Sequence, residues 1–168
     1  APYNLFTSSS LWQKLYSNFV KASSTAWLGW KFNSSITPSK SIKSIHLPFS
    51  NSYEVIWKYS VASGSYERYL DGVKQFDREG GAITADNVIA QFVSIQLLDE
   101  IGRLRIDTSS GGEARILRKG GMERGTWKKD SVAGRTVFYD KDDWEIILAP
   151  GKTWIEVLPN NAIIKVES

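Results

Sequence analysis

Short strand patterns separated by tight-turn signals run from about residue 44 to the end of the chain, and they constrain the fold more than any other feature. The runs are rich in β-branched and aromatic residues and are typical of strands. The turns between them are short, as at Ala62-Ser63-Gly64 and Asp71-Gly72. Because tight turns join antiparallel strands, the pattern predicts antiparallel sheets built from successive hairpins.

Four hairpins can be assigned by residue range. They pair 53–60 with 65–70, 113–117 with 123–128, 135–139 with 144–148, and 153–158 with 162–166. Residues 88–98 form the longest apolar run and are predicted to be one strand.

Only residues 8–21 have clear helical periodicity. The apolar positions are Leu11, Trp12, Leu15, Tyr16, Phe19 and Val20. They predict an amphipathic helix whose apolar face packs on a sheet, with Ser10 and Gln13 as a capping box. The predicted fold class is therefore α+β, mainly β, with one N-terminal helix on antiparallel sheets.

The length of 168 residues fits one domain, 1–168. Residues 1–35 carry the helix and belong either to this domain or to the end of a preceding one. A Ser-rich loop follows at 34–44, and residues 42–168 form the β-rich part.

Composition excludes several chemistries. The chain has no Cys and a single histidine, His46, so we expect no disulfide, no metal centre and no cofactor. A Ser-His-Asp triad would have to use His46, which lies between apolar neighbours and is interpreted as structural. The composition leaves three possibilities open: catalysis by carboxylates, catalysis by a Ser/Lys pair, or a protein without catalytic activity. The net charge of +3 is small for a nucleic-acid-binding domain, so we expect no nucleic-acid partner.

Cations beside a tryptophan form the first candidate binding site. Trp127 is followed by Lys128 and Lys129, and Arg135 lies six residues further on. An exposed Trp beside cations can stack on a sugar ring and pair with an anion. The alternative is a solvated strand whose Trp caps the core.

The turn that begins at Asp107 is a second candidate. Small and polar residues follow as far as Gly112. The turn lacks the Lys-Ser/Thr of a phosphate-binding loop, but its backbone N–H groups can face an anion. The alternative is a plain turn.

Several motifs in order resemble a known bacterial family. They are Asn87-Val88-Ile89-Ala90-Gln91-Phe92-Val93, Gly102-Arg103, Ser110-Gly111-Gly112, Gly125-Thr126-Trp127-Lys128-Lys129, Phe138-Tyr139-Asp140 and Pro150-Gly151-Lys152-Thr153-Trp154. At these spacings the chain resembles the C-terminal domain of the YerB-like lipoproteins, a family of unknown function. It departs from the family at Asp142-Asp143-Trp144, which makes Trp144 a further candidate recognition residue.

The resemblance implies an extracellular location at the bacterial cell surface, with membrane contact only through a lipid anchor upstream. It also implies a preceding N-terminal domain as a partner. The expected function is a non-catalytic binding or scaffolding module, with cell-wall glycan or an envelope protein as its partner. The alternative is a hydrolase or transferase of envelope polymers, which would need two carboxylates facing a cleft or a buried Lys beside a Ser.

Overall fold

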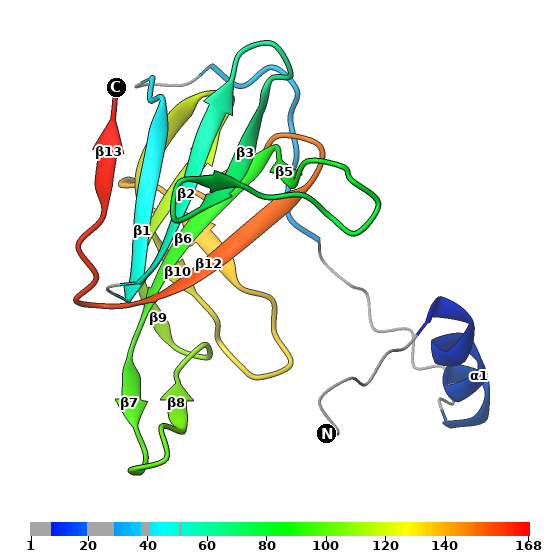
Figure 1. Ribbon diagram of the computed structural model, residues 1–168. Helices are drawn as coiled ribbons and strands as arrows, with labels where there is room; N and C mark the ends of the chain where they lie inside the picture. Colours follow the sequence, from blue (N-terminus) through cyan, green and yellow to red (C-terminus); the bar gives the residue numbers. More distant parts are fainter. Residues whose placement is uncertain (1–7, 20–28, 38–40, 51) are drawn as a thin grey trace.

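The computed structural model describes residues 8–19, 29–37, 41–50 and 52–168. Within them the chain is mainly β, as predicted, with one short helix and two larger sheets (Figure 1). A separate two-stranded hairpin extends from the end of the sheets.

The first sheet has the strand order β13-β1-β2-β3-β4, and β5 also pairs with β3. Its strands are β1 (Ser44–Ser50), β2 (Tyr53–Ser60), β3 (Ser65–Leu70), β4 (Val73–Lys74), β5 (Thr84–Ala85) and β13 (Lys165–Glu167). All of its pairings are antiparallel. The β2–β3 hairpin has the predicted bounds, and its turn ends at Gly64, whose positive φ of 67° suits a residue without Cβ.

The second sheet has the strand order β11-β10-β9-β6-β12. Its strands are β6 (Asn87–Val93), β9 (Gly111–Arg118), β10 (Gly121–Lys128), β11 (Val137–Tyr139) and β12 (Thr153–Pro159). The β9–β10 hairpin is confirmed and is longer than the sequence predicted. The pairing of β12 with β6 is parallel, so a purely antiparallel sheet is the wrong prediction here.

One predicted hairpin is wrong, and another is shorter than predicted. Strand β12 does not pair with the segment after it; β13 crosses to the first sheet and pairs with β1. Residues 144–148 pair with β11 as predicted, but only around the antiparallel Tyr139–Glu145 bridge, where Ile146 donates its backbone N–H to Phe138. The end of the segment leaves β11, and Leu148 bonds to the backbone of Lys31 and Asn33. A local pattern shows that a segment is extended but not which edge completes its backbone hydrogen bonds.

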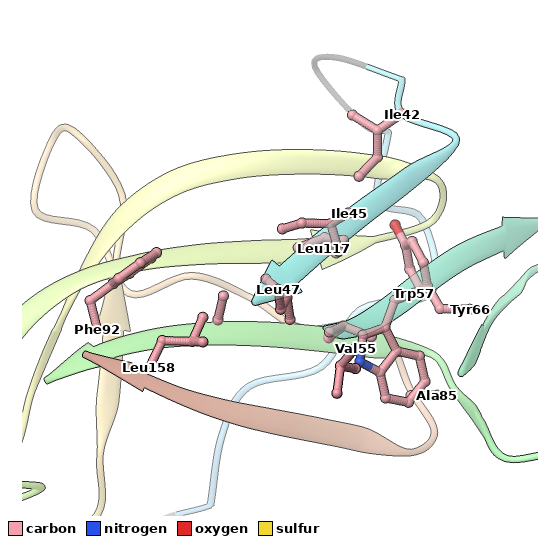
Figure 2. Packing of buried hydrophobic residues seen from close by; sticks show 12 residues of the cluster. Ile42, Ile45, Leu47, Val55, Trp57, Tyr66, Ala85, Phe92, Leu117 and Leu158 are labelled. Atoms are coloured by element: carbon pink, nitrogen blue, oxygen red, sulfur yellow. The ribbon is translucent and has the colours of Figure 1, made fainter. Parts of the chain in front are cut away.

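The first core lies between the two sheets (Figure 2). Its fully buried members include Trp57 from β2, Tyr66 from β3 and Leu117 from β9. Tyr66 donates its hydroxyl to the carbonyl oxygen of Gly121 at 3.1 Å, and burial raises the pKa of this phenol. The hydrogen bond therefore links the first sheet to the start of β10.

A second core covers the opposite face of the second sheet. It contains Ile89, Val93, Trp127, Phe138 and others, with Trp30 packed against them. Every residue of β6 is buried, because alternate side chains enter the first and the second core. The segment 29–33 thus packs on the β-rich part, with Trp30 donating its indole N–H to Thr136.

The predicted strand over 88–98 is interrupted. It ends at Val93, and a new strand β7 (Ile95–Leu97) begins after Ser94 and pairs with β8 (Leu104–Ile106). Figure 1 shows this β7–β8 hairpin projecting away from both sheets. Asp99 closes its turn by accepting the backbone N–H of Arg103, whose guanidinium also pairs with the Asp99 carboxylate.

Helix α1 (Ser9–Phe19) lies close to its predicted position. Its first turn is capped by Ser8 rather than Ser10, because the Ser8 hydroxyl accepts the backbone N–H of Leu11 at 3.3 Å. Leu11, Trp12 and Leu15 are at least half exposed, and Figure 1 shows the helix apart from the sheets. Packing of the apolar stripe on a sheet is therefore not confirmed. Within the described residues no helix is long and apolar enough to cross a membrane.

Candidate functional site

A polar cleft of about 430 Å³ lies at the base of the β7–β8 hairpin. Its lining residues are Ser94, Gln96, Arg105, Ile106, Asp107, Ser109 and Ser110. One wall is the hairpin and the other is the turn that follows β8. The backbone N–H of Asp107 donates to the carbonyl oxygen of Ser94 at 3.0 Å and fixes the two walls together.

Asp107 is the candidate residue that the structure places in this cleft. Its Oδ1 accepts the backbone N–H of Ser109 at 3.0 Å. This bond, followed by one from the Ser110 hydroxyl, lowers the pKa of the Asp107 carboxyl below its usual value. Asp107 therefore carries a negative charge and is held in one orientation by the turn it begins.

The remaining charged group of the cleft is Arg105. No hydrogen bond or ion pair joins its guanidinium to another side chain of the described chain, although its charge also helps to lower the pKa of Asp107. Arg103, two residues earlier, is instead paired with Asp99 at the tip of the hairpin. The cleft thus contains one cation, one anion and several hydroxyl and amide groups.

Lys129 of the first candidate site lies beside the turn that begins at Asp107, but Trp127 does not face solvent. Lys129 donates its backbone N–H to Ser110 at 2.8 Å. Trp127 is fully buried in the second core, where its indole N–H donates to the carbonyl oxygen of Phe92 at 2.7 Å. A Cβ on Gly112 would lie 2.8 Å from the indole nitrogen, so glycine there makes room for the ring. Trp127 therefore caps the core and cannot stack on a ligand.

The other predicted residues lie around a different turn. Arg135 pairs with Glu145 at 2.7 Å, and Glu145 also binds Lys31 at 3.2 Å. The hydrogen bond from Arg135, and then that from Lys31, lowers the pKa of the Glu145 carboxyl; the same bond raises the pKa of Arg135. Arg135 is thus engaged in an ion pair with Glu145, and the same carboxylate holds Lys31.

Trp144 is the exposed tryptophan of this second turn, with 74% of its surface accessible. Asp140 organises the turn by accepting the backbone N–H groups of Asp142 and Trp144, both at 2.9 Å. Lys128 reaches the same turn through an exposed pair with Asp143 at 3.8 Å. The structure therefore separates the six candidates. Asp107 lines the cleft, and Lys129 bonds through its backbone to the turn beside it. Trp127 lies in the core, and the other three, Lys128, Trp144 and Arg135, lie at the second turn.

The β7–β8 hairpin also carries an exposed apolar surface. Ile95 is paired with Ile106, and Leu97 with Leu104, so these four side chains share one face. We call it the apolar hairpin face. Ile95 packs on the second core, whereas Leu97, Leu104 and Ile106 are 67%, 52% and 46% exposed. The apolar surface therefore begins at the core and continues outward without a partner in the described chain.

A buried polar cluster connects the two sheets on the other side of the molecule. Arg68 of β3 lies 3.5 Å from Glu156 of β12, and both side chains are less than a tenth exposed. Glu156 also accepts the indole N–H of Trp57 at 2.9 Å. The second Arg68 contact is to Gln75 at 3.0 Å, and the guanidinium lies over the ring of Trp154. These contacts join the two sheets.

His46 has two carboxylates beside it rather than a nucleophile. Its Nδ1 lies 3.3 Å from Glu54 and its Nε2 lies 3.6 Å from Glu167. The nearby Ser44 donates its hydroxyl to Glu167 at 2.8 Å, and this bond lowers the pKa of the Glu167 carboxyl. Among the described residues, no three His, Asp or Glu side chains converge as metal ligands would.

Comparison with known proteins identifies the family. The family described as "Protein of unknown function (DUF3048) C-terminal domain" matches residues 45–155. The chain belongs to this family.

Two further comparisons show that this DUF3048 C-terminal domain is similar to a Bacillus subtilis protein. The chain is 34% identical over 107 residues to "Putative lipoprotein YerB" of strain 168, which covers 63% of this chain and 31% of that protein. The crystal structure of the YerB protein matches with a TM-score of 0.70 and 26% identity over 95% of this chain. The match covers 54% of the solved YerB chain, so this domain spans only part of its relatives' length. The resemblance to the YerB-like family is confirmed.

Sequence reasoning missed most of the DUF3048 domain's cleft and its apolar hairpin face. The signal was present as two short alternating triplets, Ile95-Gln96-Leu97 and Leu104-Arg105-Ile106, on either side of Gly102. Treating 88–98 as one strand concealed it, because the first triplet was absorbed into that strand. The ion pair between Arg68 and Glu156 had no sequence signal, since 87 intervening residues separate its partners.

Proposed function

We propose that this chain is a non-catalytic, extracytoplasmic binding module of a cell-surface lipoprotein, and that it binds an envelope protein through the apolar hairpin face. The name of the Bacillus subtilis relative supports the location, with membrane contact through a lipid anchor upstream. The exposed, continuous apolar surface of Leu97, Leu104 and Ile106 is the observation that carries the binding role.

The apolar face of the projecting hairpin needs a packing partner. A two-stranded hairpin is marginally stable in water unless its apolar face packs against something. Here only Ile95, at the base, reaches the core. The turn adds Leu98 and Ile101, which are 58% and 80% exposed. A projecting cluster of aliphatic side chains of this kind is typical of a protein-binding surface.

A protein partner fits this face better than a glycan does. Sugar surfaces use exposed, flat aromatic rings, whereas the hairpin presents aliphatic side chains. Trp127, one of the two aromatic candidates from the sequence, is buried, and the other, Trp144, lies at a separate turn. A hydrolase would need two carboxylates in the polar cleft, and Asp107 is the single carboxylate among its lining residues.

Site-specific photo-crosslinking in the native host tests the proposal. A photoreactive amino acid at Leu104 of the full-length lipoprotein is expected to give one discrete adduct with another protein. Leu97→Ser, on the same face, should abolish that adduct, while Val73→Ser, 68% exposed in the first sheet, should leave it.

A probe at Val61, which is 86% exposed in the β2–β3 turn, is the matched control and should not form the adduct. The proposal is overturned by an identical adduct at Val61, by no adduct at Leu104, or by a crosslink within the same polypeptide. The last result would mean that another part of the full-length protein covers the face.

A further inference from the structure

The β7–β8 hairpin has a second face with a different chemistry. Gln96 and Arg105 are directly paired across the strands, and they alternate with the apolar pairs on either side. They therefore point to the side opposite Leu97 and Leu104. That side is the wall of the polar cleft.

The cleft offers hydrogen-bond donors and acceptors together. Arg105 can only donate, Asp107 as a carboxylate can only accept, and the Gln96 amide does both. The hydroxyls of Ser94, Ser109 and Ser110 also do both. A ligand that satisfies this set must itself carry several groups that donate and accept.

The Asp107 carboxylate suits a ligand that carries hydroxyl groups better than it suits an anion. Its charge is fixed by the turn, since Ser109 and Ser110 donate to it and the carboxylate remains ionised. A carboxylate on the wall repels phosphate or a second carboxylate, but it accepts a hydrogen bond from a hydroxyl readily. Arg105, whose guanidinium has no hydrogen bond or ion pair to a side chain of the described residues, supplies the complementary donors.

We propose that the polar cleft is a carbohydrate-binding subsite, in which Arg105 and Asp107 bind neighbouring hydroxyls of a neutral sugar. A sugar hydroxyl donates and accepts at once, so it matches a wall with both functions. The volume of about 430 Å³ lies in the range of small-ligand sites.

This subsite goes beyond the protein-binding role proposed above, and it uses the opposite face of the hairpin. The two roles can therefore fail separately. Leu97→Ser should leave sugar binding unchanged, and a change at Arg105 should leave the crosslink from position 104 unchanged.

Titration of the protein with soluble oligosaccharides, followed by backbone amide NMR, tests the subsite. The probes are the β-1,4-linked tetramer of N-acetylglucosamine and cellotetraose, with poly(glycerol phosphate) as an anionic polymer. At least one sugar is expected to bind saturably and to shift the amides of residues 94–96 and 105–110. Arg105→Met should weaken binding about tenfold, as expected for loss of a hydrogen bond from a charged donor.

Arg103→Met is the matched control, because Arg103 lies on the same hairpin but pairs with Asp99 outside the cleft. It should change the sugar Kd by less than about twofold, within the range of an exposed ion pair. The subsite is overturned if neither sugar binds at millimolar concentration, if only the anionic polymer binds, or if the shifted amides lie around Trp144. Equal losses in both arginine variants also contradict it.

Discussion

Two regions of this molecule reverse the usual placement of polar and apolar side chains. Between the sheets, the charged pair Arg68 and Glu156 is buried beside Trp57. On the projecting hairpin, the aliphatic side chains of Leu97 and Leu104 are exposed. The first region places charged side chains inside the fold, and the second exposes apolar side chains to solvent.

The difference lies in where the partners are. Each charge of the buried pair faces the other within the same domain, and Gln75 and Trp57 provide further hydrogen bonds. The domain's own folding therefore accounts for that region. The apolar hairpin face has no such partner in the described chain, and we propose that a bound protein covers it.

The largest expected effect comes from breaking the buried pair. Glu156→Gln keeps the shape and an oxygen for Trp57, but it leaves the Arg68 charge buried without a counter-ion. Removing one partner of a buried pair costs about 3–5 kcal/mol. Urea denaturation should show a loss of that size in the free energy of unfolding.

The control is the exposed pair of Arg115 and Glu113, which are 2.8 Å apart with the Glu113 side chain 70% exposed. Glu113→Gln should cost no more than about 1 kcal/mol. Similar losses in both variants would mean that burial does not distinguish the two pairs.

A smaller effect is expected from acid at Glu145, which joins Lys31 and Arg135. These partners lower the pKa of Glu145 in the folded state, so its ion pairs add stability above the unfolded carboxyl pKa of about 4.3. That contribution is lost as the pH falls through the folded-state pKa. Wild type should therefore exceed Glu145→Gln in unfolding free energy at pH 7, with the difference shrinking toward pH 3. A difference independent of pH would contradict this origin.

Local sequence predicted the elements more reliably than their neighbours. The β2–β3 hairpin was placed correctly because its alternation and its turn at Gly64 are contained within 18 residues. The partner of β12 was not, because pairing with β6 joins segments 66 residues apart, Asn87 and Thr153. Nothing in a window of a few residues encodes that choice.

The candidate site follows the same logic. Asp107 was selected because it begins a run of small, polar residues typical of a turn, and it does line the cleft. Arg105 was missed, since its role depends on strand pairing with Gln96. The sequence around Trp127 fits either a core residue or an exposed ring that stacks on a ligand. Trp127 is a core residue because the segments that contain Trp30 and Phe138 pack over it.

The central claim is that the apolar hairpin face belongs to binding and not to the domain's core. Urea denaturation of the Leu97→Ser, Leu104→Ser double variant tests it most directly, with Leu117→Ala of the first core as the reference. The double variant should lie within about 1 kcal/mol of wild type, as for two surface changes, whereas Leu117→Ala should lose about 2–5 kcal/mol. A loss in the double variant as large as that of Leu117→Ala would show that the face is packed within the protein, and would contradict the account.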